Sequence, residues 1–148
     1  MPKLKNMKKK LIGLYELISG IFGVILLIAS SVKKIDSVEL FFQLLLGVLM
    51  FAGVAYAGNG LLNNKKRGVK HSKIAQAFQI LAIQVSGMFY KFTGAAFLAI
   101  TYTKTTGVKL LTSAQPIDYT ISKIAQTDLK ITLYILPIIL LLLLLKEK

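Results

Sequence analysis

The chain of 148 residues contains no cysteine, no tryptophan, one histidine, and six acidic residues against 19 basic ones. Without cysteine there is no disulfide framework, no thiol nucleophile and no cysteine-based metal site. The single histidine, His71, lies in a basic connection without a second ligand nearby, so a solvated loop residue explains it better than a metal site. The common nucleotide-binding and metalloprotease motifs are also missing from the sequence. These absences predict a protein that is not an enzyme and uses no cofactor.

What the chain has in excess is long apolar runs, and hydrophobic residues make up 55% of it. A bilayer core about 30 Å thick needs roughly 20 apolar residues per helix, with about 17 as a lower limit. Four runs reach that limit, at residues 11–32, 38–62, 74–102 and 129–145. The remaining connections are too short for a separate soluble domain. We therefore expect an all-α fold, an integral membrane four-helix transmembrane bundle that forms a single domain over residues 1–148.

Two segments allow further interpretations. The first apolar run follows three lysines and ends near Ala29 and Ser31, as in a cleavable signal peptide. The run is longer than the usual apolar core of about 7–15 residues, so we expect a retained helix. The long connection 103–128 contains Ile117, Ile121, Ile124 and Ala125, a spacing that predicts a short interfacial helix.

The net charge of +13 comes from lysines that flank the apolar runs. Basic residues that bind nucleic acid are instead gathered on one soluble face, so we expect no nucleic-acid partner. Twelve cations fall in the N-terminal segment, the connection 63–73 and the C-terminus, against six in the other two connections. Because positive charge accumulates on the cytoplasmic side, we expect a multi-pass protein of the bacterial cytoplasmic membrane with both termini inside. The expected partners of Lys8–Lys10 and Lys65–Lys73 are anionic lipid head groups.

The first apolar run carries a carboxylate, Glu16, where lipid is expected. Gly13, Glu16, Gly20 and Gly23 follow a spacing of three and four residues, so they form one stripe of a helix. Glycines on such a stripe permit close approach by a second helix, which directs Glu16 into an interface. A carboxylate there is costly unless it is paired, hydrated or protonated. Two readings follow, a hydrogen-bonded structural carboxyl and a site that couples transport to protons or cations.

The third apolar run carries polar residues on one half of the expected helix, including Gln76, Gln79, Gln84 and Lys91. Polar side chains on a membrane helix face protein or water, so this half should face the bundle. Together with Glu16 they form the candidate intramembrane polar site. Because Gln76 and Gln79 match Glu16 in depth, we expect all three within hydrogen-bonding or single-water distance.

Lys91 is expected at a different depth from Glu16. It follows Ile74 by about 25 Å along a helix, near the outer interface. We therefore expect Lys91 to pair with Asp36 or Glu39 or to extend toward water, rather than to pair with Glu16.

Two family resemblances accompany these patterns. The first is carried by LIGLYELISGIFGVIL at residues 11–26 and GNGLLNNKKRGVKHSKIAQAFQILAI around the second connection. These segments resemble small bacterial four-helix integral membrane proteins with no assigned activity. A more distant likeness is to small multidrug resistance transporters, which also have four helices and a glutamate in the first, a role that Glu16 would take. The chain departs from those transporters in lacking tryptophan and the glycine-rich signature of their third helix.

For function, the sequence favours a small non-enzymatic integral membrane protein, an accessory or assembly partner that binds another membrane protein or a second copy of itself. The alternative is a proton-coupled small-molecule transporter or channel that uses Glu16. No motif in the sequence indicates a particular substrate.

Overall fold

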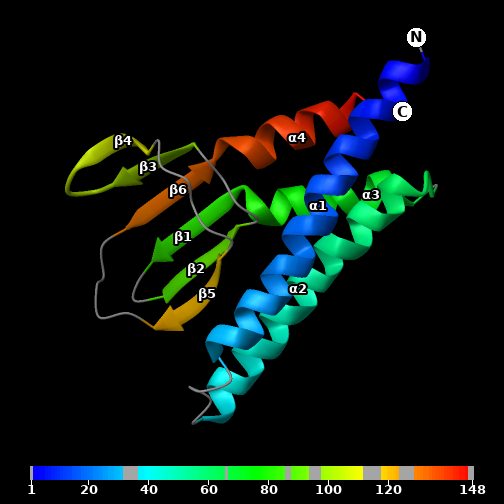
Figure 1. Cartoon of the computed structure of the whole chain (residues 1–148). Helices are drawn as coiled ribbons and strands as arrows, with labels where there is room; N and C mark the ends of the chain where they lie inside the picture. Colours follow the sequence, from blue (N-terminus) through cyan, green and yellow to red (C-terminus); the bar gives the residue numbers. More distant parts are fainter. Residues whose placement is uncertain are drawn as a thin grey trace.

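The computed structural model places a pair of long antiparallel helices beside a six-stranded sheet (Figure 1). One shorter helix precedes the first strand in the sequence, and another follows the last strand. The fold is therefore mixed α and β. The structure describes residues 2–31, 37–65, 67–85, 88–93, 98–111, 118–123 and 129–146.

The two long helices, α1 (Pro2–Ser31) and α2 (Val38–Leu62), form a hairpin that covers the first two expected spans. They approach closely because glycines face each other. A Cβ atom added at Gly58 would lie 2.5 Å from the Gly13 carbonyl oxygen, and one added at Gly20 would lie 2.5 Å from the Ala55 nitrogen. The glycine stripe of α1 therefore packs on α2, as its spacing predicts.

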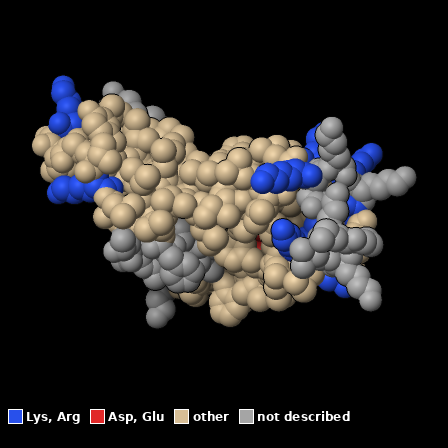
Figure 2. Space-filling view, turned by 90° about the horizontal axis from the view of Figure 1, so that it is seen from above, with Lys and Arg blue, Asp and Glu red and all other residues tan. Residues whose placement is uncertain are grey.

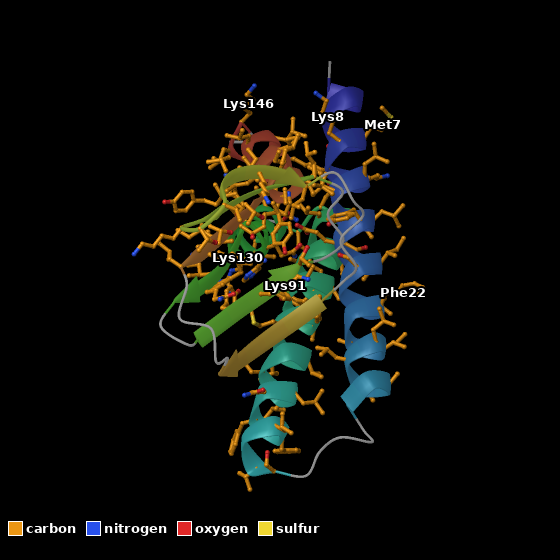
Figure 3. The ribbon with its side chains drawn as sticks, turned by 90° about the vertical axis from the view of Figure 1, so that its left-hand side faces the viewer. Met7, Lys8, Phe22, Lys91, Lys130 and Lys146 are labelled. Atoms are coloured by element: carbon orange, nitrogen blue, oxygen red, sulfur yellow. The ribbon has the colours of Figure 1, made fainter. Side chains whose placement is uncertain are left out.

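The outer surface of this hairpin is apolar and exposed. The candidate spans Asn6–Ala29 and Leu40–Leu62 are long and apolar enough to cross a membrane, and only 33% and 22% of their most apolar stretches are buried. A core helix of a soluble protein would be enclosed on most sides. The side chain of Phe22, for example, is 54% exposed and points away from α2 (Figure 3). These two helices support association with a membrane.

The chain reverses direction after α2 and enters α3 (Gly68–Gln79). Asn64 adopts a left-handed conformation with φ of 50°, which asparagine tolerates better than most residues. The reversal brings Gly68 against Gly60, where a Cβ atom on Gly68 would lie 2.5 Å from the Gly60 carbonyl carbon. Glycine at both positions therefore sets the close contact between α2 and α3.

The expected third transmembrane helix over residues 74–102 is wrong. Helix α3 ends at Gln79, and the chain continues as strands β1 (Leu81–Val85), β2 (Met88–Thr93) and β3 (Ala99–Thr103). These strands are rich in β-branched and aromatic residues, which favour extended backbone. Short apolar strands close together in the chain have the same mean hydropathy as one long helix, and periodicity alone separates them poorly. The all-α four-helix transmembrane bundle is therefore overturned.

Three further strands complete the sheet: β4 (Gly107–Leu111), β5 (Asp118–Lys123) and β6 (Lys130–Tyr134). The strand order is β4-β3-β6-β1-β2-β5, and every neighbouring pair is antiparallel. Strand β4 begins at Gly107, directly after the three-residue turn 104–106, and the Gly107 φ of 70° is one that glycine adopts without steric cost.

The expected interfacial helix within residues 103–128 is also wrong where the structure describes it, because Asp118–Lys123 is strand β5. Ile117, Ile124 and Ala125, which belong to the same expectation, lie outside the described residues.

The fourth expected span, 129–145, divides into strand β6 and helix α4 (Ile135–Leu145). Pro137 lies in the first turn of α4, where a missing N–H costs no helical hydrogen bond. At 11 residues α4 is about 16 Å long, too short to cross a bilayer core of about 30 Å.

The far end of α4 packs against the helical hairpin. Leu144 forms a buried cluster with Ile12 of α1 and Leu61 of α2. The beginning of α1 and the end of α4 therefore lie at the same end of the molecule, where Figure 3 shows Lys8 and Lys146. A second cluster joins α2, α3 and the sheet, with the rings of Phe51 and Phe92 4.8 Å apart.

We predict that Gly58→Ala lowers the free energy of unfolding by about 1–3 kcal/mol, because the added methyl group enters a packed helix interface. The matched control is Gly53→Ala on the same helix, where an added Cβ has no heavy atom within 4 Å. The control should be neutral or stabilising by up to about 1 kcal/mol through helix propensity. Thermal unfolding in detergent, followed by circular dichroism, measures both. Equal loss of stability in the two variants would contradict the close packing.

Candidate polar site around Glu16

The carboxylate of Glu16 is enclosed where α1, α2 and α3 meet. The side chain is 0% exposed. Its position follows from the glycine stripe, since a Cβ atom added at Gly58 of α2 would lie 2.9 Å from the Glu16 Cβ. The absence of side chains on these glycines brings α2 close and leaves the longer Glu16 side chain to extend toward α3.

Two donors from α3 bind one oxygen of this carboxylate. Ser72 Oγ donates a hydrogen bond to Glu16 Oε1, and Gln76 Nε2 donates to the same oxygen at 2.7 Å. Ser72 and Gln76 are both buried and lie four residues apart, so they share one face of α3. Because donors and acceptor are all buried, loss of either bond would leave a polar group without a partner. This cluster therefore ties α3 to α1.

Several other buried polar atoms near this face of α3 have unused hydrogen-bonding capacity. Among the described residues, Glu16 Oε2, Gln76 Oε1 and both amide atoms of Gln79 have no hydrogen-bond partner. Most buried polar atoms in proteins are paired, so such a group indicates strain or a role in binding. Glu16 itself also accepts a bond from Ser19 Oγ to its backbone oxygen, at 3.3 Å.

The structure brings some of the predicted site residues together and separates others. Glu16 and Gln76 are hydrogen-bonded. Gln79 lies on the same face of α3, but it makes no hydrogen bond to Glu16. Gln84 belongs to β1 and Lys91 to β2, so neither extends a polar stripe along a third transmembrane helix.

Gln84 and Lys91 instead share one face of the sheet. The register pairs Ile83 with Tyr90, so the next residue of β1 and the next of β2 both point to the opposite face. Asp36 and the Glu39 side chain, the expected partners of Lys91, lie outside what the structure describes.

Sequence reasoning missed Ser72 as a partner of Glu16. The sequence does contain a feature that predicts this contact, because Ser72, Gln76 and Gln79 follow the spacing i, i+4 and i+7 of a single helical face. The basic residues on both sides placed Ser72 in a solvated connection, whereas the structure buries it completely.

The described residues hold no group of three or more histidine, cysteine, aspartate or glutamate side chains arranged to bind a metal ion. The chemistry around Glu16 is therefore that of one carboxylate, one hydroxyl and two carboxamides. Such a set can hold a helix in place, or bind water, a proton or a small cation.

Comparison of the chain with protein-family models, curated proteins and solved structures found no match. The resemblances to small bacterial membrane proteins and to small multidrug resistance transporters therefore stay hypotheses. Function must be inferred from the geometry of this chain.

We predict that Glu16→Leu lowers the free energy of unfolding by about 1–3 kcal/mol for each buried donor that loses its acceptor. Glu16→Gln should be milder, because its amide oxygen can still accept from Ser72 and Gln76. Thermal unfolding of both variants measures the difference. Adding Ser72→Ala to Glu16→Leu should recover part of the loss, since one unpaired donor is then removed. A double variant no more stable than Glu16→Leu would contradict the role of Ser72.

Proposed function

We propose that the chain is a small integral membrane protein without catalytic activity, which acts as an accessory or assembly partner in the bacterial cytoplasmic membrane. The observation that carries the proposal is the exposed apolar surface of α1 and α2. Soluble proteins rarely expose contiguous apolar patches larger than a few hundred Å². A bilayer around the hairpin would remove this surface from water.

The distribution of cations supports an orientation with both termini in the cytoplasm. Figure 2 shows Lys and Arg gathered at the end of the molecule where α1 begins, with a second group over the far end of the sheet. Figure 3 labels Lys8 of α1 and Lys146 after α4 at this end of the molecule. Anionic lipid head groups are the proposed partners of this end.

A partner surface on the sheet supports the role in assembly. One face of β4, β3 and β6 carries exposed apolar side chains at Val108, Leu110, Ile100, Tyr102 and Leu133. The register places Leu110 and Leu133 on either side of Ile100, so these side chains form one continuous surface. We propose that another membrane protein or a second copy of the chain covers it.

The orientation predicts opposite accessibility of the two ends of α2. The native chain has no cysteine, so Val38→Cys and Lys65→Cys each introduce a single thiol at an exposed position. A membrane-impermeant maleimide should label Val38→Cys in intact bacterial cells and Lys65→Cys only after lysis. Labelling of Lys65→Cys from outside would reverse the orientation. Release of the chain from membranes by alkaline carbonate would refute its integration.

The second candidate function is proton-coupled transport or conduction that uses Glu16. Two buried oxygen atoms, Glu16 Oε2 and Gln76 Oε1, have no hydrogen-bond partner in the described part of the chain, and they favour this function because they can accept from water, bind a proton or contact a cation.

For transport, we predict that liposomes containing the chain move a cationic dye when a pH gradient is imposed, and that Glu16→Gln abolishes this movement. The amide keeps an acceptor for α3 but cannot exchange a proton, so folding should be retained. Circular dichroism of the same variant provides the control. Movement equal to that of empty liposomes would eliminate this candidate and leave the assembly role.

A further inference from the structure

A large apolar groove lies on the side of α3 opposite the Glu16 cluster. It has a volume of about 680 Å³ and is bounded by α2, α3 and the strands β1 and β2. The helical face of α3 that lines it carries His71, Ile74 and Phe78, whereas the residues next to them, such as Ser72, face Glu16. Sites that hold small molecules span about 300–1,000 Å³, so the groove is large enough for a ligand.

The groove is elongated along α2. Its lining on that helix extends from Tyr56 through Gly53 and Leu49 to Leu46, a distance of about 15 Å at 1.5 Å per residue. Gly53 widens it, since a Cβ atom added there would have no heavy atom within 4 Å. The opposite wall includes Phe92 of the sheet. A long, narrow, apolar ligand fits this shape.

One end of the groove is polar. There the rings of Tyr56 and His71 lie 5.5 Å apart in an edge-on arrangement. Arg67 and Lys70 are exposed and do not line the groove, but each lies four residues before a lining residue, His71 and Ile74 respectively, and so shares the helical face that borders it. Glu16 is turned toward the other face of α3, where it binds Ser72 and Gln76.

We propose that this groove binds one acyl chain of an anionic phospholipid, with the head group held by Arg67, Lys70 and the His71–Tyr56 end. The inference rests on the proposed membrane placement of α2. Tyrosine favours the level of the head groups, so Tyr56 marks the interface and Leu46 lies deeper. The charge of Arg67 and Lys70 complements a phosphate, and each nearby cation contributes about fivefold to the affinity for anionic lipid.

The test uses the full chain reconstituted in phosphatidylcholine vesicles that contain a minor fraction of phosphatidylglycerol with a diazirine on its acyl chain. After illumination, mass spectrometry locates the labelled residues. We expect labelling to concentrate on the groove, at Leu46, Leu49 and Phe78, and not on the outer face of α1 around Phe22. Equal labelling of Phe22 and the groove would indicate ordinary surrounding lipid and overturn the inference.

A matched pair of variants tests the groove itself. Gly53→Leu adds a side chain where a Cβ atom has no heavy atom within 4 Å, and it should reduce groove labelling about tenfold, equivalent to about 1.4 kcal/mol. Ala52→Leu adds the same side chain at an exposed position of α2 outside the groove, and labelling should stay unchanged. Undiminished labelling in Gly53→Leu would overturn the inference.

A second pair of probes tests the two cations beside the polar end. The same diazirine chain on phosphatidylcholine should label the wild-type groove at least about fivefold less than the phosphatidylglycerol probe. Combining Arg67→Gln with Lys70→Gln should remove this preference. Equal labelling of the wild type by both probes would overturn the proposed head-group contacts.

Alkaline carbonate extraction of the same preparations separates this inference from the proposed function. If the chain stays in the membrane but the groove is not labelled, the lipid site is refuted and the membrane function stands. If carbonate releases the chain, the proposed function itself fails.

Discussion

The hydrogen bonds between the Glu16 carboxylate and α3 tie this short helix, and the sheet that follows it, to α1. Helix α1 supplies the acceptor, while Ser72 and Gln76 supply the donors. Glycines on α1 and α2 bring the hairpin close enough for Glu16 to reach past α2. Because β1 follows α3 after one residue, the direction of α3 also sets the position of the sheet.

Helix α3 separates two environments by its two faces. Ser72, Gln76 and Gln79 are buried toward the hairpin, and His71 and Ile74 line the apolar groove. A rotation of α3 about its axis would move both sets at once, since neighbouring positions on one helix are rigidly linked. Any ligand in the groove and any change at Glu16 would thus act on the same short helix.

The parts of the fold that the sequence predicted depend on local spacing. The spacing of Gly13, Glu16 and Gly20 specifies which face of α1 packs against α2, and it does not depend on how the rest of the chain folds. The contact of Glu16 with Gln76 could also be predicted, because Glu16 lies on the glycine stripe of α1 and Gln76 lies in the part of the third apolar run that is helical. Ser72 was hidden by the basic residues beside it, which obscure the burial of a small hydroxyl.

The second half of the fold could not be predicted by the same means. In a sheet, apolar residues of β1, β3 and β6 are adjacent because of pairing between strands distant in the chain. Hydropathy along the chain does not depend on such pairing, so the apolar runs that contain these strands and α4 have the pattern of two membrane helices. The groove was equally hidden, since its walls come from three separate segments.

Strand β4 limits how deep the sheet can sit. It lies at the end of the strand order and, among the described strands, pairs with β3 alone, so one side of its backbone has no neighbouring strand there. Hydrocarbon cannot satisfy these N–H and C=O groups, and an open edge is excluded from the bilayer interior. Lys104 in the adjoining turn and Lys109 in the strand are both exposed and prefer water as well. In the proposed membrane placement, the β3–β4 hairpin therefore has to lie at the level of the head groups or in the water beyond them.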